Sequence, residues 1–369
     1  MKNKENTMEI NRTRVLFCDL LGLPKGKYIP PDLAKSGHVG FAKGAFATTF
    51  DRDLLTIPGT GVYDGLPDMD LYLENNRFTS WQQNTEIALG VLKKNNKPFE
   101  LCSRTALINT IKDFEKIDLK PKVGIEFEAY VFEQDVDGVW IPYNTPGAFV
   151  YGTGPSNDPR NLISKIWNKA YEVNIPLESI NGEYDNGQFE LTLSFDDALK
   201  ACDNSFLFKI MAKEIALNEG LILSFMPKPI PERGGSGLHI NFSFEDKKNS
   251  NIIAPDGKLS EISKNCIAGL LKHHESLAAL LANTVNSYDR LQPASMAGYW
   301  ANWAEDHRLV TIRTSSASPK SARIEHRTAD GAANPYLAVT SVLQASLLGI
   351  KNNYSLQPAE DLDGLENVR

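Results

Sequence analysis

The stretch Gly124-Ile-Glu-Phe-Glu-Ala-Tyr-Val131 alternates acidic and apolar residues, and this alternation decides the fold around it. Successive side chains of a β-strand point to opposite faces, so Glu126 and Glu128 share one face. Ile125 and Phe127 share the other face. The apolar face predicts burial against a core, and the acidic face predicts a surface that carries chemistry.

Four further segments alternate metal-binding or charged side chains with apolar ones: Gly187-Gln-Phe-Glu-Leu-Thr-Leu193, Gly237-Leu-His-Ile-Asn-Phe-Ser243, Val310-Thr-Ile-Arg313 and Ala322-Arg-Ile-Glu-His-Arg327. A sheet of these strands would gather several carboxylates, an imidazole and several guanidiniums on one face. Like charges at such spacing repel one another unless cations neutralise them. The pattern therefore predicts divalent metal ions and an anionic ligand, which is the chemistry of an ATP-dependent enzyme.

Composition places the chain among ordinary globular proteins of one large domain or two unequal domains. It has 369 residues, of which 42% are hydrophobic and 23% charged. The net charge of -7 argues against nucleic-acid binding. Four dispersed cysteines form no CxxC pair and predict a reducing compartment: Cys18, Cys102, Cys202 and Cys266. No apolar run approaches the roughly 18 residues of a membrane helix, so we expect a cytoplasmic protein without membrane partners.

Local patterns predict a small β-rich part followed by a larger α+β part. The first part has a strand at 14–21 and long loops over 28–80. Helices are predicted at 81–94, 104–114, 159–174, 202–219, 261–285 and 335–350. A loop is predicted at 226–237, since three prolines and three glycines exclude regular structure there. A hinge at Leu119-Lys-Pro-Lys122 would follow a domain boundary near 100–118.

Each motif alone is weak, but their combination and order resemble the glutamine synthetase family. The series is Val123-Gly-Ile-Glu-Phe-Glu, Glu183-Tyr-Asp-Asn-Gly-Gln-Phe-Glu190, Ser224-Phe-Met-Pro-Lys-Pro229, Gly235-Ser-Gly-Leu-His239, Asn286-Ser-Tyr-Asp-Arg-Leu291, Arg323-Ile-Glu-His-Arg327 and Asp330-Gly-Ala-Ala-Asn-Pro-Tyr-Leu337. It spans about residues 120 to 350. Phe17-Cys-Asp-Leu-Leu-Gly22 and Pro67-Asp-Met-Asp-Leu71 resemble the family's small domain more loosely.

The resemblance implies an α+β fold with two domains. Residues 12–105 would form a small N-terminal β-grasp domain, and residues 106–369 a large catalytic domain of glutamine synthetase type with a shortened C-terminal end. The catalytic domain would hold a curved antiparallel sheet flanked by helices. Family active sites lie between subunits, so the resemblance also implies a homo-oligomeric ring.

The resemblance implies ATP as co-substrate and two or more Mg²⁺ or Mn²⁺ ions, which hard oxygen ligands and one imidazole suit. One ion would take Glu128, Glu183 and Glu190, and a second would take Glu126, His239 and Glu325. Nucleotide contacts would come from Asn241, Ser243, Arg308, Arg313 and Arg323. Substrate contacts would come from Gly235, His239, Arg290 and Arg327, of which Arg290 and Arg327 would hold glutamate. Arg290, Arg313 and Arg327 are the expected catalytic residues.

The resemblance implies a reaction in two steps. Glutamate and ATP first form γ-glutamyl phosphate, and a nitrogen nucleophile, ammonia or an amine, then displaces the phosphate. Ammonia-using members carry a glutamate six residues after the arginine that matches Arg290, where this chain has Met296. They also carry Asp-Gly-Ser-Ser in the small domain, where Tyr63-Asp-Gly-Leu-Pro lacks the serines. Tyr299, Trp300 and Trp303 could line an amine site or simply pack together.

We therefore predict a γ-glutamyl-amine or γ-glutamyl-polyamine ligase, with ammonia or an organic amine as the nucleophile still to be decided. Glutamine synthetase proper is the main alternative. A non-catalytic structural or sensing relative is an alternative of another class, although every matched metal ligand is present. A phosphagen-kinase-like enzyme ranks last, because such kinases are not expected to carry this motif series.

Overall fold

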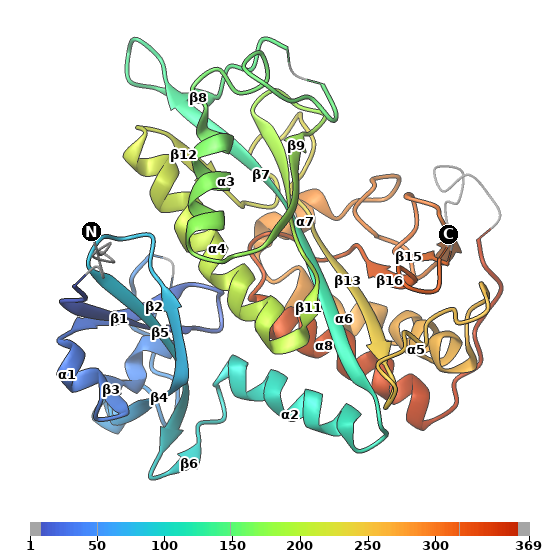
Figure 1. Ribbon diagram of the computed structural model, residues 1–369, viewed down its shortest axis with the longest axis horizontal. Coiled ribbons are helices and arrows are strands. Elements are labelled where there is room, and N and C mark those ends of the chain that lie inside the picture. The colour runs from blue at the N-terminus through green and yellow to red at the C-terminus, as the bar shows by residue number, and fades with distance from the viewer. Residues whose placement is uncertain (1–8, 50, 148, 317, 361–369) are drawn as a thin grey trace, which may run out of the picture. The chain divides into compact units, whose positions relative to one another are not determined.

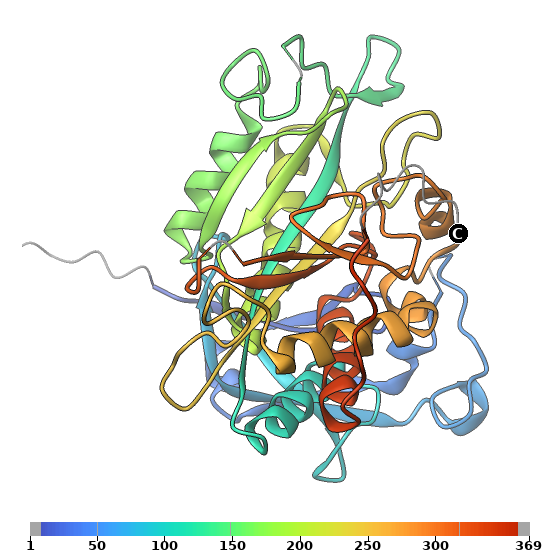
Figure 2. The same cartoon turned by 90° about the vertical axis from the view of Figure 1, so that its right-hand side faces the viewer.

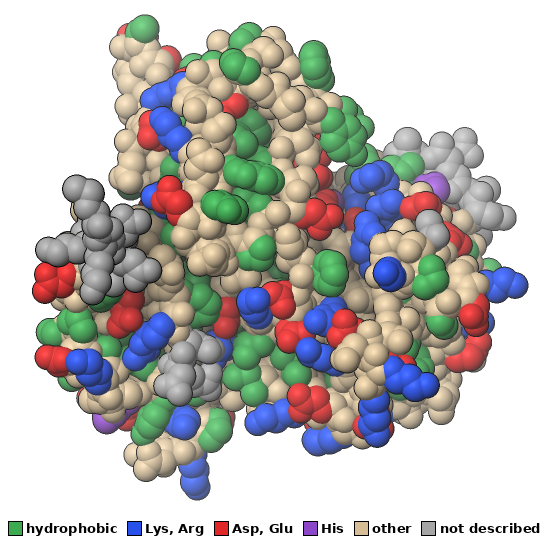
Figure 3. Space-filling model, viewed as in Figure 1, with side chains coloured by type: hydrophobic (Ala, Val, Ile, Leu, Met, Phe, Trp, Pro, Cys, Tyr) green, Lys and Arg blue, Asp and Glu red, His purple; other side chains and the backbone are tan. Residues whose placement is uncertain are grey.

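The computed structural model describes residues 9–49, 51–147, 149–316 and 318–360 (Figure 1). The chain divides into two compact units. The first unit runs to Thr105 and includes Glu172–Asn174, and the second holds Ala106–Tyr171 and the chain from Ile175 onward. Acidic and basic side chains are mixed over the face drawn in Figure 3. In the ranges described above, no helix combines the length and apolar character needed to cross a membrane.

The first unit is built on a six-stranded sheet in the order β2-β1-β5-β4-β3, with β6 paired to β5. Its strands are β1 (Arg12–Cys18), β2 (Pro24–Ile29), β3 (His38–Ala42), β4 (Asp68–Thr79), β5 (Thr85–Lys94) and β6 (Lys97–Pro98). β1 and β5 run parallel to each other. Short helical turns connect the strands: α1 (Pro31–Ala34), η1 (Lys43–Phe46) and η2 (Val62–Asp64). The assignment of this unit as a β-grasp domain remains a prediction.

The helix predicted at 81–94 is wrong, because this segment forms strand β5. Its residues from Ile87 to Leu92 are all buried, so both faces of the strand are covered. A strand covered on both faces reads as a continuous apolar run, which periodicity cannot distinguish from a buried helix. The sheet, and not the local pattern, decides the conformation here.

The second unit is built on a ten-stranded sheet in the order β14-β15-β16-β13-β7-β10-β9, with β8, β11 and β12 also paired to β7. Its strands are β7 (Lys120–Gln134), β8 (Trp140–Pro142), β9 (Leu177–Gly182), β10 (Gln188–Leu193), β11 (Asp196–Asp197), β12 (Ile222–Ser224), β13 (Leu238–Glu245), β14 (Trp303–Glu305), β15 (Ile312–Ser315) and β16 (Arg323–His326). The expected antiparallel pairing holds except between β14 and β15, which are parallel.

Helix α4 (Ala198–Asn218) packs against β7, β11 and β12 of this sheet, and α8 (Pro335–Lys351) packs in turn against α4, α5 (Glu261–Lys272) and α6 (His274–Leu281). The remaining described helices are α2 (Ser103–Glu115), α3 (Leu162–Glu172) and α7 (Val285–Arg290). Ile125 and Phe127 on β7 are 1% and 0% exposed, and α4 packs against this strand. The long strand β7 (teal) runs through the unit in Figures 1 and 2. The predicted alternation of β7 therefore holds: its apolar side faces the core.

Two local predictions in this unit are wrong. The helix expected at 261–285 breaks at His273, whose φ of -104° and ψ of 10° separate α5 from α6. The hinge expected at 119–122 lies largely inside β7, where Pro121 pairs with Phe244 of β13. Apolar periodicity continues through a helix break, and a proline can be accommodated in a strand when the partner needs no hydrogen bond from it.

Close contact between α5 (orange) and α8 (red) depends on glycine, and the two helices lie side by side in Figures 1 and 2. A Cβ on Gly269 would overlap the carbonyl oxygen of Ala345 and lie 2.9 Å from the amide nitrogen of Gly349. We predict that Gly269→Ala lowers the free energy of unfolding by about 1–3 kcal/mol through overpacking, as measured by chemical denaturation. Ser276→Ala, at an exposed position of α6, is the control, and equal effects of the two substitutions would contradict the prediction.

Candidate active site

The register of β7 with its two neighbours concentrates acidic side chains on one face. Glu128 of β7 lies directly opposite Glu190 of β10. Glu126 lies opposite His239 of β13. Like charges at directly opposed positions of an antiparallel pair are destabilising, so this face carries an electrostatic cost. Glu126 and Glu128 share one face of β7, as predicted. The neighbouring strand β10 adds Glu190 to the same face.

One imidazole and two guanidiniums offset part of that charge. Nδ1 of His239 donates to Glu126 Oε1 at 2.6 Å, and its Nε2 lies 3.8 Å from Glu128 Oε1. Glu325 of β16 is 4% exposed and lies 3.8 Å from the same Nδ1 atom. Arg313 Nη1 donates to Glu325 Oε2 at 3.0 Å, and Arg327 donates to Glu325 Oε1. The row of acids is thus interleaved with hydrogen-bond donors, two of which are guanidiniums.

Protonation differs along this row. Burial, together with the charge of Glu126, raises the pKa of Glu190. Burial and the charge of Glu128 raise the pKa of Glu183. Burial also disfavours the charged form of Glu126, but the charge and hydrogen bond of His239 outweigh it and lower the pKa. The carboxylates cannot all ionise freely in this arrangement, which is the situation that bound cations relieve.

A cavity of about 490 Å³ opens beside this row, and we call it the carboxylate cavity. Its described lining is Glu128, Val150, Tyr151, Glu183, Tyr184, Asp185, Gln188, Glu190, Lys228, Gly234, Gly235, His239, Arg290, Ser295, Met296, Ala297, Arg308 and Arg327. This lining contains four acidic side chains and three arginines. A cavity of this kind suits a small ligand that carries charges of both signs.

Backbone contacts fix Arg290 in the carboxylate cavity. Arg290, on α7, is 7% exposed and donates to the carbonyl oxygen of Thr328 at 2.9 Å and to that of Arg327 at 3.3 Å. The loop opposite is held by Gln188, whose Nε2 donates to the carbonyl oxygen of Gly235 at 2.9 Å. Arg290 therefore has a defined position, although burial lowers its pKa from the usual arginine value.

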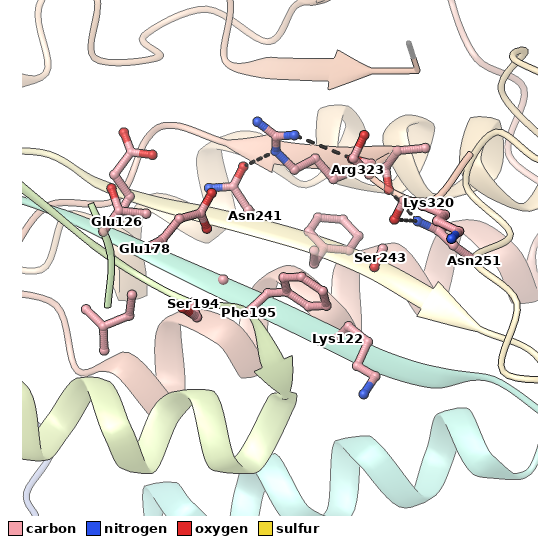
Figure 4. Close-up of a pocket in the computed structure, with 16 residues that line it drawn as sticks. Lys122, Glu126, Glu178, Ser194, Phe195, Asn241, Ser243, Asn251, Lys320 and Arg323 are labelled. Atoms are coloured by element: carbon pink, nitrogen blue, oxygen red, sulfur yellow. Dashed lines mark hydrogen bonds between the residues drawn. The ribbon is translucent and has the colours of Figure 1, made fainter. Parts of the chain in front are cut away.

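A second cavity of about 390 Å³ lies along β13, and we call it the Phe195 cavity (Figure 4). Glu126 and Glu178 stand at one end of it, and Asn251 and Lys320 stand at the other. Arg323 Nε donates to Asn241 Oδ1 at 3.1 Å within it. Phe195 is 66% exposed, so this aromatic residue is accessible to a ligand.

Most of the predicted site residues line one of these two cavities. The carboxylate cavity holds Glu128, Glu183, Glu190, Gly235, His239, Arg290, Arg308 and Arg327. The Phe195 cavity holds Glu126, Asn241, Ser243 and Arg323. Glu325 and Arg313 lie in the network that joins β15 and β16 to His239. Arg308, which was expected to contact the nucleotide together with Asn241, Ser243 and Arg323, lines the carboxylate cavity and not the Phe195 cavity.

Sequence reasoning missed several lining residues. Tyr184 and Asp185 lie in the motif at residues 183–190, of which only Glu183 and Glu190 were predicted as site residues. Val150 and Phe195 follow no motif, and only the fold carries them to a cavity. Sequence patterns could not predict these residues, because loop residues follow no periodicity and only the tertiary structure places them in a cavity.

The three aromatic residues that follow Met296 pack against their surroundings. Tyr299 and Trp300 meet edge to face with ring centroids 4.7 Å apart. Nε1 of Trp303 donates to the carbonyl oxygen of Gln357 at 2.9 Å. None of the three belongs to the described lining of the carboxylate cavity, whereas Met296 does. The packing alternative is therefore favoured for these aromatics.

The donor set of five carboxylates and one imidazole suits Mg²⁺ or Mn²⁺ in type. Among the residues with a described position, no three His, Cys, Asp or Glu side chains converge closely enough to hold an ion as they stand. Some of the oxygens are engaged elsewhere: Gly237 N–H donates to Glu128 Oε2 at 2.7 Å, and Arg313 and Arg327 both bind Glu325. An incoming ion would have to compete with these donors for the same oxygens.

Comparison with known proteins identifies the fold and its relatives. Residues 100–368 match the family described as glutamine synthetase, catalytic domain. The chain is 32% identical to the glutamine synthetase of Pyrococcus woesei over 351 residues, covering 93% of this chain and 76% of that protein. It is 29% identical to the gamma-glutamylputrescine synthetase of Escherichia coli K12 over 369 residues, covering 95% and 78%. The solved apo structure of GmaS without ligand matches with a TM-score of 0.82 at 27% identity, covering 96% of this chain and 81% of that one.

We predict that, without divalent ions, Glu190 makes the folded protein less stable as pH rises. Burial and Glu126 raise its folded-state pKa from 4.5 to about 9. Between these values the unfolded chain has released this proton while the folded chain retains it, so stability present at low pH is lost as pH rises through the window. Denaturation at several pH values in the presence of a chelator measures the slope.

Glu190→Gln should flatten that slope, because the amide cannot ionise. Glu275→Gln, at an exposed carboxylate of α6, is the control and should leave the slope as it is. A slope that is identical in the Glu190→Gln variant and the parent protein would contradict the assignment of this proton to Glu190.

Proposed function

The chain belongs to the glutamine synthetase family of ATP-dependent carbon–nitrogen ligases, and from this premise we propose that it joins glutamate to an organic amine through a γ-amide bond. The observation that carries the choice of amine is the position of Met296 in the lining of the carboxylate cavity, 44% exposed. A thioether cannot bind ammonium as a carboxylate does, nor take its proton. Ala297 and Val150 add apolar surface to the same lining, which favours an alkyl substituent on the nitrogen.

The proposed reaction proceeds by two displacements. The γ-carboxylate of glutamate attacks the γ-phosphorus of ATP, and the bond to the bridging oxygen breaks to release ADP. The amine nitrogen then attacks the carbonyl carbon of γ-glutamyl phosphate, and the carbon–oxygen bond breaks to release phosphate. The proton lost by the nitrogen passes to a carboxylate or to solvent. Positioning and charge neutralisation supply most of such catalysis.

In this proposal glutamate occupies the carboxylate cavity, with Arg290 and Arg327 binding its carboxylates. The nucleotide occupies the Phe195 cavity, where Asn241, Ser243 and Arg323 offer polar contacts. Arg308 and Arg313 would contact phosphates from the side of β15. The planar guanidinium fork suits both carboxylate and phosphate.

Two divalent ions complete the proposed site. Glu128, Glu183 and Glu190 would hold one ion, and Glu126, His239 and Glu325 would hold the other. When bound, such ions neutralise charge on the transferred phosphoryl group. A homo-oligomeric ring is the proposed assembly, as the family resemblance implies.

Glutamine synthetase proper is the second candidate function, and the relative from Pyrococcus woesei favours it. Under that alternative, Met296 cannot bind ammonium, and acidic side chains that line the carboxylate cavity would bind it in place of the family's glutamate. A non-catalytic role is disfavoured by the retention of the whole acidic row with its imidazole.

We predict that an amine, and not ammonium, drives glutamate-dependent release of phosphate from Mg·ATP. The assay compares ammonium with short alkylamines and diamines, one at a time, at equal concentration. A chelator added to the active well should stop the release, and excess Mg²⁺ or Mn²⁺ should restore it. Release driven by ammonium with no response to any amine would overturn the choice of nucleophile and leave glutamine synthetase proper.

We predict that Met296→Glu shifts the preference toward ammonium by about tenfold in kcat/KM relative to the best amine. One charge-assisted hydrogen bond is of this size, and the introduced carboxylate would supply it. Met296→Leu is the matched control, because it keeps an apolar side chain of similar volume and should leave the preference as it is. A Met296→Glu enzyme with the parent preference would show that residue 296 does not contact the nucleophile.

A further inference from the structure

Asp185 is the one acidic residue in the described lining of the carboxylate cavity that is not a proposed metal ligand. The cavity's described lining contains four acidic side chains, and three of them, Glu128, Glu183 and Glu190, belong to the proposed metal site. Asp185 lies in the turn between β9 and β10, two residues beyond Glu183. It is partly exposed toward the cavity, so its charge is accessible to a small ligand.

One carboxylate oxygen of Asp185 is held firmly. The backbone N–H of Gly234 donates to Oδ2 at 2.6 Å, and the hydroxyl oxygen of Tyr130 lies 2.9 Å from the same atom. The Tyr130 side chain is completely buried, and burial together with Asp185 raises the pKa of its hydroxyl, which therefore remains a donor at neutral pH. In the described part of the chain, no hydrogen bond or ion pair reaches the other oxygen, Oδ1.

The same loop brings a cation and this anion together. A Cβ on Gly234 would lie 2.9 Å from Asp185 Oδ2, and a Cβ on Gly235 would lie 2.7 Å from Arg290 Cγ. Two consecutive glycines thus let oppositely charged side chains approach one loop. The α-carbon of an amino acid carries a carboxylate and an ammonium group, and recognition of both needs one cation and one anion set close together.

We propose that Asp185 binds the α-ammonium group of the amino-acid substrate while Arg290 binds its α-carboxylate. The inference rests on the proposed function, because that function places glutamate in this cavity. Asp185 and Arg290 both contact the Gly234–Gly235 loop. A substrate whose α-carboxylate is bound by Arg290 therefore brings its own α-ammonium group toward Asp185, which favours this group over the ammonium of the incoming amine. Asp185 is thus a specificity residue that distinguishes an α-amino diacid from a plain diacid.

The test is a binding measurement with two ligands that differ only in the α-ammonium group. Calorimetric titrations with glutamate and with glutarate, in the presence of Mg²⁺ and ADP, are made on the parent protein and on Asp185→Asn. The substitution should weaken glutamate about ten- to hundredfold, the size of a lost charge-assisted contact, and leave glutarate unchanged. Asn retains an oxygen that can accept from Gly234.

The matched control is Asp135→Asn. Asp135 also accepts backbone N–H bonds, from Asp137 and Val139 at 2.9 Å each, but lies in the turn between β7 and β8, outside the described lining of the cavity. It should alter neither titration. Tyr130→Phe, which loosens Asp185 without removing its charge, should weaken glutamate by a smaller factor than Asp185→Asn.

Three results would overturn the assignment of Asp185 and leave the proposed function intact. Equal weakening of glutamate and glutarate would show that Asp185 only supports the loop, and unchanged binding of both would show that it contacts neither. A KM that rises for the amine while glutamate binding is unchanged would move Asp185 to the nucleophile. A parent protein that binds neither diacid would instead defeat the proposed function, and the assignment of Asp185 with it.

Discussion

Repulsion among the carboxylates on one face of the second unit's sheet is the constraint on which the site depends. Glu128 and Glu190 are directly opposed across β7 and β10, and their neighbours add further negative charge. Such a face is tolerated because His239, Arg313 and Arg327 are interleaved with it. The apolar face beneath, packed against α4, holds the strands in the register that creates the repulsion.

This constraint also explains how the two cavities are related. Glu126 lines the Phe195 cavity, whereas Glu128, two residues further along the same face, lines the carboxylate cavity. One strand therefore contributes an acid to each cavity. A phosphoryl group that passes between ligands in the two cavities would cross this row of acids, where cations are most strongly attracted.

In the proposed function, loop residues carry specificity, and the sheet carries the charge. Met296, Tyr184 and Asp185 lie outside the central strands, and each enters the carboxylate cavity from a connecting segment. Loops can change without disturbing strand register, so a family can retain its acidic sheet while its nucleophile and substrate contacts differ. The relatives of this chain include a glutamine synthetase and a gamma-glutamylputrescine synthetase.

The acidic strands and their faces follow from the sequence alone, because a period of two in β7, β10 and β13 leaves one way to bury Phe127, Leu191 and Ile240. Helices such as α4 and α8 also follow from the sequence, because their apolar segments are longer than a typical strand. Tertiary structure alone decided that 85–94 is a strand, since burial on both faces removes the periodicity that would identify it. It alone decided which loop residues reach the cavities: Phe195 and Val150 have no local signal, and the position of a loop side chain depends on contacts with segments far away in the chain.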